Sequence, residues 1–284
     1  MLSTDLVLSG PPFVHVPLFD RLVPAREAGF AGISLTPGDI WTLEKEGIPA
    51  GDIRQRIEDH GLAIKELDCI AAWLPAQRTQ TNGSPLASLL RSLTPERVIE
   101  TAARIGAPSV TIVEMLGVSP SRDEAAEAFA TVCDLAAEHG LNVHLEFLPF
   151  GGIPDLARAW AIVEAADPPN GGLTLDSWHF FRSNSSFDLL RAIPGERIHT
   201  VQINDAPALP ANDLMHETMN ARLVPGVGSF DLVRLIQTLD TIGCEAPVSV
   251  EVFSADIANR PMADAIQGWA DAAHTIIAQA RNPT

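Results

Sequence analysis

Short runs of apolar residues alternate along this chain with longer segments that have the periodicity of amphipathic helices. Eight of these runs are rich in Val, Ile, Leu or Thr, as expected of strands that are covered on both faces. They are Leu6–Ser9, Gly32–Thr36, Leu62–Asp68, Ser109–Glu114, Asn142–Leu148, Gly172–Asp176, Ile198–Asn204 and Val248–Phe253. The pattern therefore predicts eight short, buried strands.

The segments between these strands carry signals for the ends of helices. Thr94 followed by Pro95 is a helix cap with proline at the first helical position, and Gly106 marks the end of that helix. Gly29, Gly140 and Gly243 each precede a predicted strand, where a left-handed cap is needed. The helices with the clearest patterns are Arg97–Ile105, Arg122–His139, Ser229–Ile242 and Pro261–Ala280.

The alternation of strands and helices predicts the fold class. Strict alternation of eight strands with helices over about 250 residues is typical of a (β/α)8 barrel. A doubly wound open sheet is the structural alternative, but no glycine-rich phosphate loop follows any predicted strand. No linker, low-complexity tract or block of charge divides the chain. We therefore predict an α/β protein with one (β/α)8 TIM-barrel domain over residues 1–284.

The charge balance and the cysteines narrow the range of partners and compartments. The 284 residues include 19 Lys+Arg and 36 Asp+Glu, a formal charge of −17, which opposes nucleic-acid binding because phosphate contacts need a basic surface. Cys69, Cys133 and Cys244 are far apart and form no CxxC pair, which favours a reducing compartment. The chain has no signal-like start and no apolar run of about 20 residues. We expect a cytoplasmic protein with no membrane partner.

Polar residues occupy one face of four consecutive predicted strands, close to their carboxyl ends. In a barrel, alternate residues of each strand point inward, and catalytic groups gather at the carboxyl ends of the strands. The polar residues on this face near those ends include Glu146, Asp176, Gln202 and Glu251, and Asn204 shares the face of Gln202. The sequence therefore predicts that these four side chains converge at the mouth of the barrel.

Three carboxylates that converge with no nearby Lys or Arg would repel one another and would be costly to desolvate. A bound divalent cation removes this difficulty, and oxygen ligands suit Mg²⁺ or Mn²⁺ better than an ion that prefers thiolates. Any single strand carboxylate is as readily explained by an ion pair or a helix cap. Four such residues in matching register favour a metal site.

Several segments match a known family in the same order and at similar spacings. They are Ala28–Ile33, His144–Phe147, Leu175–His179, Val201–Asp205 and Val250–Glu251. Together they resemble the xylose isomerase-like TIM-barrel superfamily, often labelled sugar phosphate isomerases/epimerases. That group contains ketose 3-epimerases, inosose isomerases and dehydratases, 3-dehydroshikimate dehydratases and, more distantly, the endonuclease IV repair enzymes. The motifs are specific for the superfamily but not for a substrate.

The resemblance implies one divalent metal ion with ligands at Glu146, Asp176, Gln202 and Glu251. The seventh-strand ligand is most often His in the family, and Gln202 takes its place here. An amide oxygen in place of an imidazole nitrogen shifts the preference toward Mn²⁺ or Mg²⁺, with Co²⁺ or Zn²⁺ as further options.

Residues expected to bind the substrate lie beside these ligands. The family counterpart of His179 contacts substrate oxygens, and metal ligation by His179 is the alternative. Arg222 resembles a family Arg that precedes a Pro-Gly turn, and its planar guanidinium would suit a carboxylate or phosphate. We also expect Glu66, His144 and Trp178 to line the substrate pocket.

A metal held between glutamates on the fifth and eighth strands points to proton transfer next to a carbonyl. The cation would stabilise the enediolate that develops on deprotonation, with Glu146 and Glu251 as the acid/base pair. This chemistry predicts a metal-dependent isomerase or epimerase acting on a sugar, ketose or polyol-derived small molecule. A lyase or dehydratase of the inosose or dehydroshikimate type could use the same residues, and these residues do not separate the two reactions.

Two further readings are less favoured. An endonuclease IV-like DNA-repair enzyme would need many histidines around a zinc cluster, and the negative charge opposes duplex binding. A barrel that binds a ligand without catalysis would not need the Glu/Asp/Gln/Glu set. With no phosphate nest or basic cluster in the sequence, a neutral or carboxylated polyol or ketose is preferred over a phosphorylated sugar. A homo-oligomer is possible, as in the resembling group.

Overall fold

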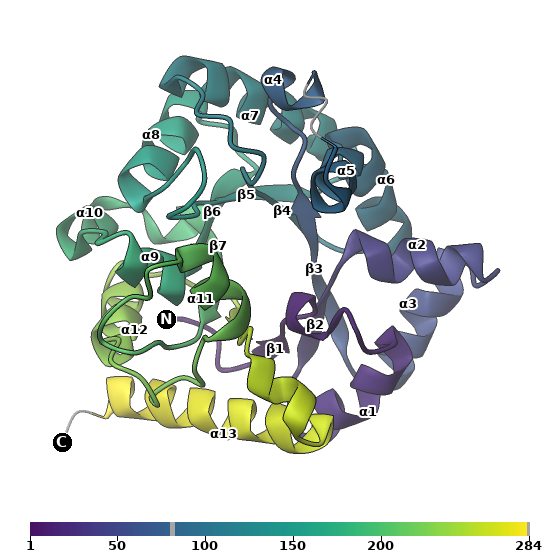
Figure 1. Ribbon diagram of the computed structural model, residues 1–284, viewed down its shortest axis with the longest axis vertical. Helices are drawn as coiled ribbons and strands as arrows, with labels where there is room; N and C mark the ends of the chain where they lie inside the picture. The colour runs from purple at the N-terminus through teal and green to yellow at the C-terminus, as the bar shows by residue number, and fades with distance from the viewer. Residues whose placement is uncertain (80–82, 283–284) are drawn as a thin grey trace.

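Eight parallel strands close into a barrel in sequence order in the computed structural model, which describes residues 1–79 and 83–282 (Figure 1). The strands are β1 (Leu6–Leu8), β2 (Gly32–Leu35), β3 (Ala63–Ile70), β4 (Ser109–Ile112), β5 (Asn142–Glu146), β6 (Gly171–Asp176), β7 (Ile198–Ile203) and β8 (Val248–Val250). The predicted single-domain (β/α)8 TIM barrel is confirmed, with strand ends within a few residues of those expected. Residues 80–82 and 283–284 of the predicted domain lie outside the described residues.

Helices surround the barrel and connect its strands (Figure 1). They are α1 (Leu18–Glu27), α2 (Pro37–Lys45), α3 (Ala50–Asp59), α4 (Pro75–Arg78), α5 (Pro85–Ser92), α6 (Pro95–Ile105), α7 (Arg122–Ala137), α8 (Leu156–Ala166), α9 (Ser177–Arg182), α10 (Phe187–Ala192), α11 (Leu214–Asn220), α12 (Leu232–Thr241) and α13 (Met262–Arg281), with short 3-10 helices at Pro11–Phe13, Gly195–Arg197 and Ala255–Asn259. Within the described ranges, none of the helices has both the length and the apolar character needed to cross a membrane.

The ends of the outer helices follow from local chemistry. The Thr94 hydroxyl accepts from the Arg97 amide at the start of α6, and Gly106 ends that helix with φ of 73°, which only glycine adopts readily. Ser121 and Glu124 form a reciprocal capping box at the start of α7. These signals explain why α6 and α7 begin where the sequence predicts.

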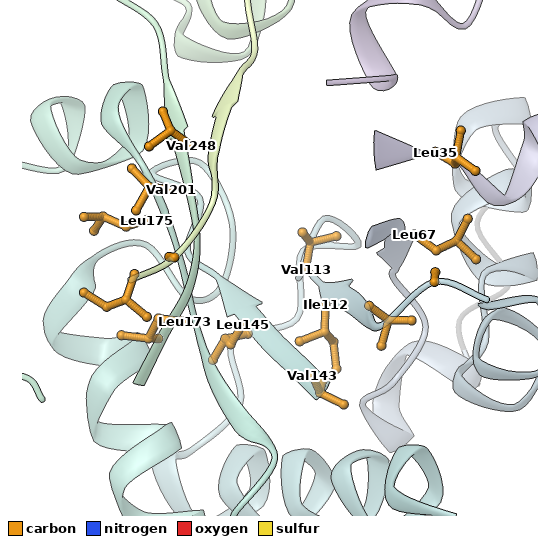
Figure 2. Close-up of a cluster of buried hydrophobic side chains, with 14 of the residues drawn as sticks. Leu35, Leu67, Ile112, Val113, Val143, Leu145, Leu173, Leu175, Val201 and Val248 are labelled. Carbon is orange, nitrogen blue, oxygen red and sulfur yellow. The ribbon is translucent and has the colours of Figure 1, made fainter. Parts of the chain in front are cut away.

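The outward faces of the strands form an apolar layer against the helices. Leu145 on β5, Leu173 and Leu175 on β6 and Val201 on β7 are fully buried there, and Figure 2 shows them among similar side chains from β2 to β8. Each fully buried aliphatic side chain contributes about 1.5–3 kcal/mol relative to an exposed one. This outer layer therefore supplies most of the hydrophobic stabilisation of the barrel.

The inward faces of the strands are polar instead. Thr111, His144 and Thr174 are completely buried and form a hydrogen-bonded row across β4, β5 and β6. On the other side of the barrel, the Thr200 hydroxyl donates to Glu66 at 2.8 Å. Buried polar groups are tolerated when they are paired in this way. The interior is thus a hydrogen-bonded layer beneath the mouth.

Candidate metal centre and active site

Four polar side chains meet at the carboxyl ends of β5, β6, β7 and β8. Glu146 and Asp176 are the last residues of their strands, Gln202 is the last but one of β7, and Glu251 follows β8 directly. Asp176 pairs with Gln202 in the strand register, and Gln202 pairs with Ser249. All four are at least 94% buried, with Glu146 the most exposed at 6%. The structure therefore brings together the residues that strand alternation predicted.

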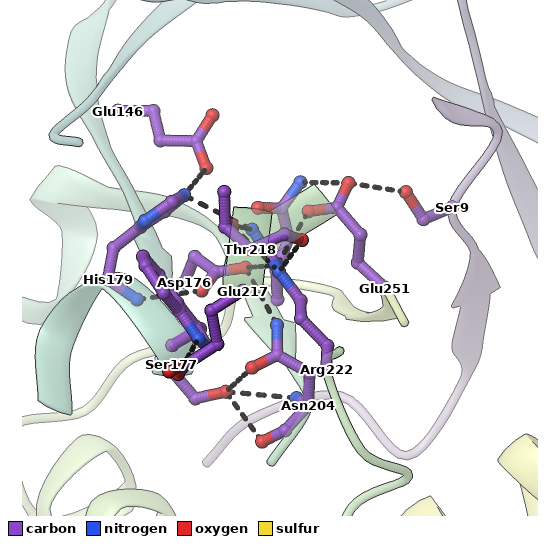
Figure 3. A network of polar contacts seen from close by, with 12 residues as sticks. Ser9, Glu146, Asp176, Ser177, His179, Asn204, Glu217, Thr218, Arg222 and Glu251 are labelled. Atoms are coloured by element: carbon purple, nitrogen blue, oxygen red, sulfur yellow. Dashed lines mark hydrogen bonds and ion pairs between the residues drawn. The ribbon is translucent and has the colours of Figure 1, made fainter. Parts of the chain in front are cut away.

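Arg222 lies among these carboxylates, so the expectation that no Lys or Arg is near them is wrong. Its Nη1 donates to Asp176 Oδ2 at 2.8 Å and to Glu251 Oε2 at 3.2 Å (Figure 3). The guanidinium is 3% exposed, so solvent screens these contacts little. Arg222 comes from the segment after α11, which the chain folds back over the strand ends. Its positive charge offsets part of the repulsion between the carboxylates.

The Arg222 guanidinium is held in place from behind. Its Nε donates to the Thr218 carbonyl oxygen at 3.0 Å, and its Nη2 donates to Thr218 Oγ1 at 2.7 Å. The guanidinium carbon lies 5.5 Å from the Trp178 ring and 5.1 Å from the Phe253 ring, within the range of cation–π contacts. One residue of α11 and two aromatic rings therefore fix the orientation of Arg222.

His179 closes another side of the site. Asp176 caps α9, and its Oδ1 accepts from the His179 amide at 3.0 Å, which places the imidazole above the strand end. His179 Nε2 lies 3.2 Å from Glu146 Oε1. Glu146, Asp176 and His179 each offer one ligand atom, and these atoms lie within 4.8 Å of one another. His179 is therefore close enough for either of its predicted roles, substrate binding or metal ligation.

The donor atoms fit a divalent cation. Gln202 Nε2 donates to Glu251 Oε1 at 3.4 Å, whereas Gln202 Oε1 is buried and has no hydrogen-bond partner among the residues described. An unpaired buried amide oxygen costs free energy unless something coordinates it. Two glutamates, one aspartate and this amide oxygen form an oxygen-rich set that suits a hard cation. Glu146, Asp176 and His179 have ligand atoms close enough together to hold an ion. Ligation by Gln202 and Glu251 stays a prediction, and Arg222 contacts Asp176 and Glu251 in this structure.

Burial and mutual repulsion shift the pKa values of these carboxyl groups. Burial and the charge of Asp176 raise the pKa of Glu146 to about 8, although Arg222 opposes the shift. Burial also raises the pKa of Glu251 to about 7, against Arg222 and with the added repulsion of Asp176 and Glu146. For Asp176 burial acts upward too, but Arg222, His179 and the His179 amide bring its pKa below the usual value. The site therefore contains both a firmly ionised carboxylate and carboxyl groups that titrate near neutrality.

Glu66 and His144, both predicted to line the substrate pocket, lie deeper in the barrel than the four strand-end residues. His144 Nδ1 lies 2.6 Å from Thr174 Oγ1, and its Nε2 lies 3.1 Å from the hydroxyl of Ser109, the first residue of β4. Its Nε2 is also 3.6 Å from Glu66 Oε2, and burial raises the pKa of Glu66 to about 7. The His144 ring is thus turned toward the amino-terminal side of the barrel. This geometry turns the His144 ring away from the mouth and places Glu66 beneath the site, and the substrate contacts expected of both residues stay predictions.

Trp178, also predicted to contact substrate, is completely buried behind Arg222. Its indole N–H donates to Glu217 Oε1 at 3.0 Å, and Arg182 Nε donates to the same oxygen at 2.6 Å. Glu217 Oε2 also accepts from the Ala211 amide. In this arrangement Trp178 supports Arg222 and anchors α11, and its direct contact with substrate stays a prediction.

Several residues that shape the site were not predicted from the sequence. Asn204 donates to Asp176 Oδ2 at 2.9 Å, and Ser9 donates to Glu251 Oε1 at 2.7 Å. Asn204 shares the face of Gln202 on its predicted strand, so the alternation contained a signal for it. Thr218 lies on α11, a short helix whose cap, Asp213, was the one available signal. Ser9 had no distinguishing pattern, because a lone serine after a strand is common.

Comparison with known proteins agrees with the fold. The family model described as "Xylose isomerase-like TIM barrel" matches residues 22–276. The chain is 28% identical over 253 residues to a 3-dehydroshikimate dehydratase of Pseudomonas aeruginosa, covering 88% of this chain and 38% of that protein. It is also 28% identical over 238 residues to an inosose isomerase of Bacillus velezensis, covering 76% of this chain and 82% of that protein. The chain thus spans less than two fifths of the length of the dehydratase.

Solved structures show the same fold. The IOLI protein with a bound zinc atom superposes with a TM-score of 0.84 at 21% identity, over 97% of this chain and 98% of that one. An L-ribulose 3-epimerase superposes with a TM-score of 0.71 at 21% identity, over 99% of this chain and 96% of that one. The match of the family model over most of the sequence, together with the closed barrel, establishes that the chain belongs to the xylose isomerase-like TIM barrel family.

Proposed function

We propose that this protein is a divalent-metal-dependent isomerase or epimerase acting on a sugar, ketose or polyol-derived substrate. The observation that carries the proposal is the buried group of Glu146, Asp176, Gln202 and Glu251 at the carboxyl ends of β5 to β8, in which Gln202 Oε1 has no hydrogen-bond partner among the described residues. Relatives named as inosose isomerases and 3-dehydroshikimate dehydratases support an enzyme that acts on a small cyclic polyol or a related compound.

Proton transfer is assigned to the two glutamates. A divalent ion, when bound, supplies the positive charge that stabilises an enediolate. Glu146 removes a proton from the carbon next to the carbonyl, and Glu251 returns one from the other side of the carbon skeleton. Ser9 holds one oxygen of Glu251 at 2.7 Å, which fixes the carboxyl group for this transfer. His179, 3.2 Å from Glu146, orients a substrate oxygen beside the base.

Isomerisation is preferred over elimination because of how the relatives align. The inosose isomerase of Bacillus velezensis is matched over 82% of its length, whereas the dehydratase of Pseudomonas aeruginosa is matched over 38%. The dehydratase alignment nevertheless covers 88% of this chain, so a lyase reaction is the second candidate. In that case the same deprotonation would be followed by loss of a hydroxyl group β to the carbonyl.

The preferred ions are Mn²⁺ and Mg²⁺, because Gln202 contributes an amide oxygen where an imidazole would favour zinc. The related fold of the IOLI protein was solved with a bound zinc atom, so Zn²⁺ and Co²⁺ belong in the test as well. Elemental analysis of the purified protein, followed by titration calorimetry with each ion, would distinguish them. Because most sites bind Zn²⁺ more tightly than Mn²⁺, the deciding measurement is activity of the metal-free protein after each ion is added back, and activity restored by Zn²⁺ but not by Mn²⁺ or Mg²⁺ would contradict the preference.

The test of the reaction is hydrogen exchange in D2O with a panel of ketoses and inososes. The metal-loaded protein should incorporate deuterium next to the carbonyl of its substrate, and a dehydrated product would identify the lyase. Glu146→Gln and Glu251→Gln should abolish exchange while leaving the circular dichroism unchanged. Glu138→Gln, on an exposed helix end, is the matched control and should exchange at the normal rate. Near-normal exchange in both active-site variants would refute the mechanism.

A further inference from the structure

A cavity opens at the carboxyl end of the barrel, above β1, β2 and β3. It has a volume of about 600 Å³, within the range of about 300–1,000 Å³ typical of small-molecule sites. Its walls come from the segment after β1, the start of α2 and helix α5, which Figure 1 shows on the same side of the barrel. No part of the mechanism above uses this cavity.

The floor of the cavity lies near the carboxyl end of β3. Asp68 and Cys69, near the carboxyl end of β3, line the cavity and are only partly buried. Burial and the charges of Glu146, Glu251 and Glu66, in that order, raise the pKa of Asp68 well above its usual value. The carboxyl end of β3, where Asp68 lies, is on the same face of the closed barrel as the ends of β5 and β8 that carry Glu146 and Glu251. A substrate bound on this face has the cavity beside it.

The upper walls are apolar. Val16, Leu43 and Leu93 line the cavity, and at its rim Val14 is 63% exposed and Leu89 is 55% exposed. Exposed aliphatic side chains gathered around a concave site are typical of ligand binding. They come from three different segments of the chain that meet at this opening.

The charges in the cavity argue against an anionic group. Arg21 is the one Lys or Arg among the described residues of the lining, and its Nη2 bonds Asp39 Oδ1 at 2.6 Å and the Val16 carbonyl oxygen at 2.6 Å. Because these partners neutralise it, Arg21 has no free charge for a phosphate or carboxylate. Asp39, Glu46 and Asp68 also line the cavity and further disfavour an anion, while its aliphatic wall suits an apolar group.

We infer that this cavity is a subsite for an apolar, ring-sized substituent of the substrate, so that the protein acts on a polyol or ketose carrying an aromatic or aliphatic group rather than on a free sugar. The inference rests on the proposed function for the polyol part of the substrate. The subsite itself rests on the cavity alone and can be tested separately.

The first test uses benzyl alcohol, which carries no sugar. In NMR titrations of the metal-loaded protein, it should shift the methyl signals of Val14, Val16 and Leu89, with a dissociation constant on the order of millimolar for so small a ligand. Leu89→Lys should weaken binding at least tenfold, and Val14→Lys should act in the same direction. Leu86→Lys is the matched control: Leu86 is 57% exposed on the same helix but does not line the cavity, and binding should stay within twofold. Absence of shifts at these methyls, or equal effects of Leu89→Lys and Leu86→Lys, would overturn the subsite.

The second test compares matched substrates in the hydrogen-exchange assay. A keto-sugar carrying a phenyl substituent should show a kcat/KM at least tenfold above that of the same keto-sugar carrying a methyl group, because about 100 Å² of additional apolar surface is buried. Leu89→Lys should remove this advantage without slowing exchange of the methyl compound. Exchange with no preference for phenyl would overturn the inference while leaving the proposed function intact. Benzyl alcohol binding without exchange of any compound would instead support the subsite and contradict the proposed function.

Discussion

Arg222 occupies the position in which a cation is most needed, and its removal should destabilise the metal-free protein. Arg222→Met keeps the aliphatic stem against Trp178 and Phe253 but deletes the charge that contacts Asp176 at 2.8 Å and Glu251 at 3.2 Å. Removing one partner of a buried ion pair costs about 3–5 kcal/mol, because the remaining charge is left uncompensated. We expect a loss of this size at pH 8 in the presence of EDTA.

A bound divalent ion should restore most of this loss. The ion supplies the missing positive charge between the same carboxylates, and a ligand at 1,000 times its dissociation constant adds about 4 kcal/mol of stability. In the natural protein part of that gain is offset, because the guanidinium must give up its contacts with Asp176 and Glu251. Metal should therefore stabilise Arg222→Met more than the natural sequence, and bind it more tightly.

The assay is urea denaturation with EDTA and, in parallel, with saturating MnCl2. Arg182→Met is the matched control, because Arg182 forms a similar buried pair with Glu217 at 2.6 Å but does not contact the proposed metal ligands. Its loss of stability should be the same with and without metal. An Arg222→Met variant whose loss is also independent of metal would refute the view that Arg222 and the ion compete for the same carboxylates.

Three further predictions concern the site and its supports. The metal-free protein should lose stability as the pH rises from about 5 to 8. The folded state keeps protons on Glu146 and Glu251, whose pKa values are about 8 and 7, whereas the unfolded chain releases these protons. The free energy of unfolding from urea midpoints should fall by up to about 1.4 kcal/mol per pH unit for each group, and a flat profile would contradict the prediction. Gln202→His should raise the affinity for Zn²⁺ relative to Mn²⁺ at least tenfold by calorimetry, and an unchanged ratio would argue against ligation at this position. Asp205→Ala should lower the free energy of unfolding by about 2–4 kcal/mol, because Asp205 accepts hydrogen bonds from the amides of Ala206, Gly226 and Phe230. An unchanged urea midpoint would show that these bonds do not hold the segment that carries Arg222.

The fold and the strand-end residues were predictable from the sequence for one physical reason. In parallel strands that are covered on both faces, apolar runs mark the strands, and the twofold alternation decides which side chain points inward. Closure of the barrel then brings the carboxyl ends of β5 to β8 together. Strand periodicity and closure are therefore enough to predict that the four strand-end residues lie near one another, namely Glu146, Asp176, Gln202 and Glu251. These predictions depend on local periodicity, which a sequence displays directly.

The position of Arg222 depends on the course of a long connection, which periodicity does not describe. Between Gln202 and Arg222 the chain leaves the barrel, forms α11 and returns to pair Ala221 with Ser254. That return is stabilised by contacts distant in sequence, such as Trp178 with Glu217. The orientation of His144 could not be predicted either. Strand alternation places its side chain inside the barrel, but does not show whether the imidazole points toward the mouth or toward Ser109. Tertiary contacts decided both outcomes.

The strands of the barrel carry apolar side chains on their outer faces and polar side chains on their inner faces. Leu145, Leu173 and Val201 pack the strands against the helices from outside. Inside, Thr111 pairs with His144, and Thr200 pairs with Glu66. A substitution among the inner residues changes the floor beneath the ligands without opening a gap in the apolar layer. The polar layer beneath the site can therefore vary in sequence while the outer apolar layer keeps the barrel closed.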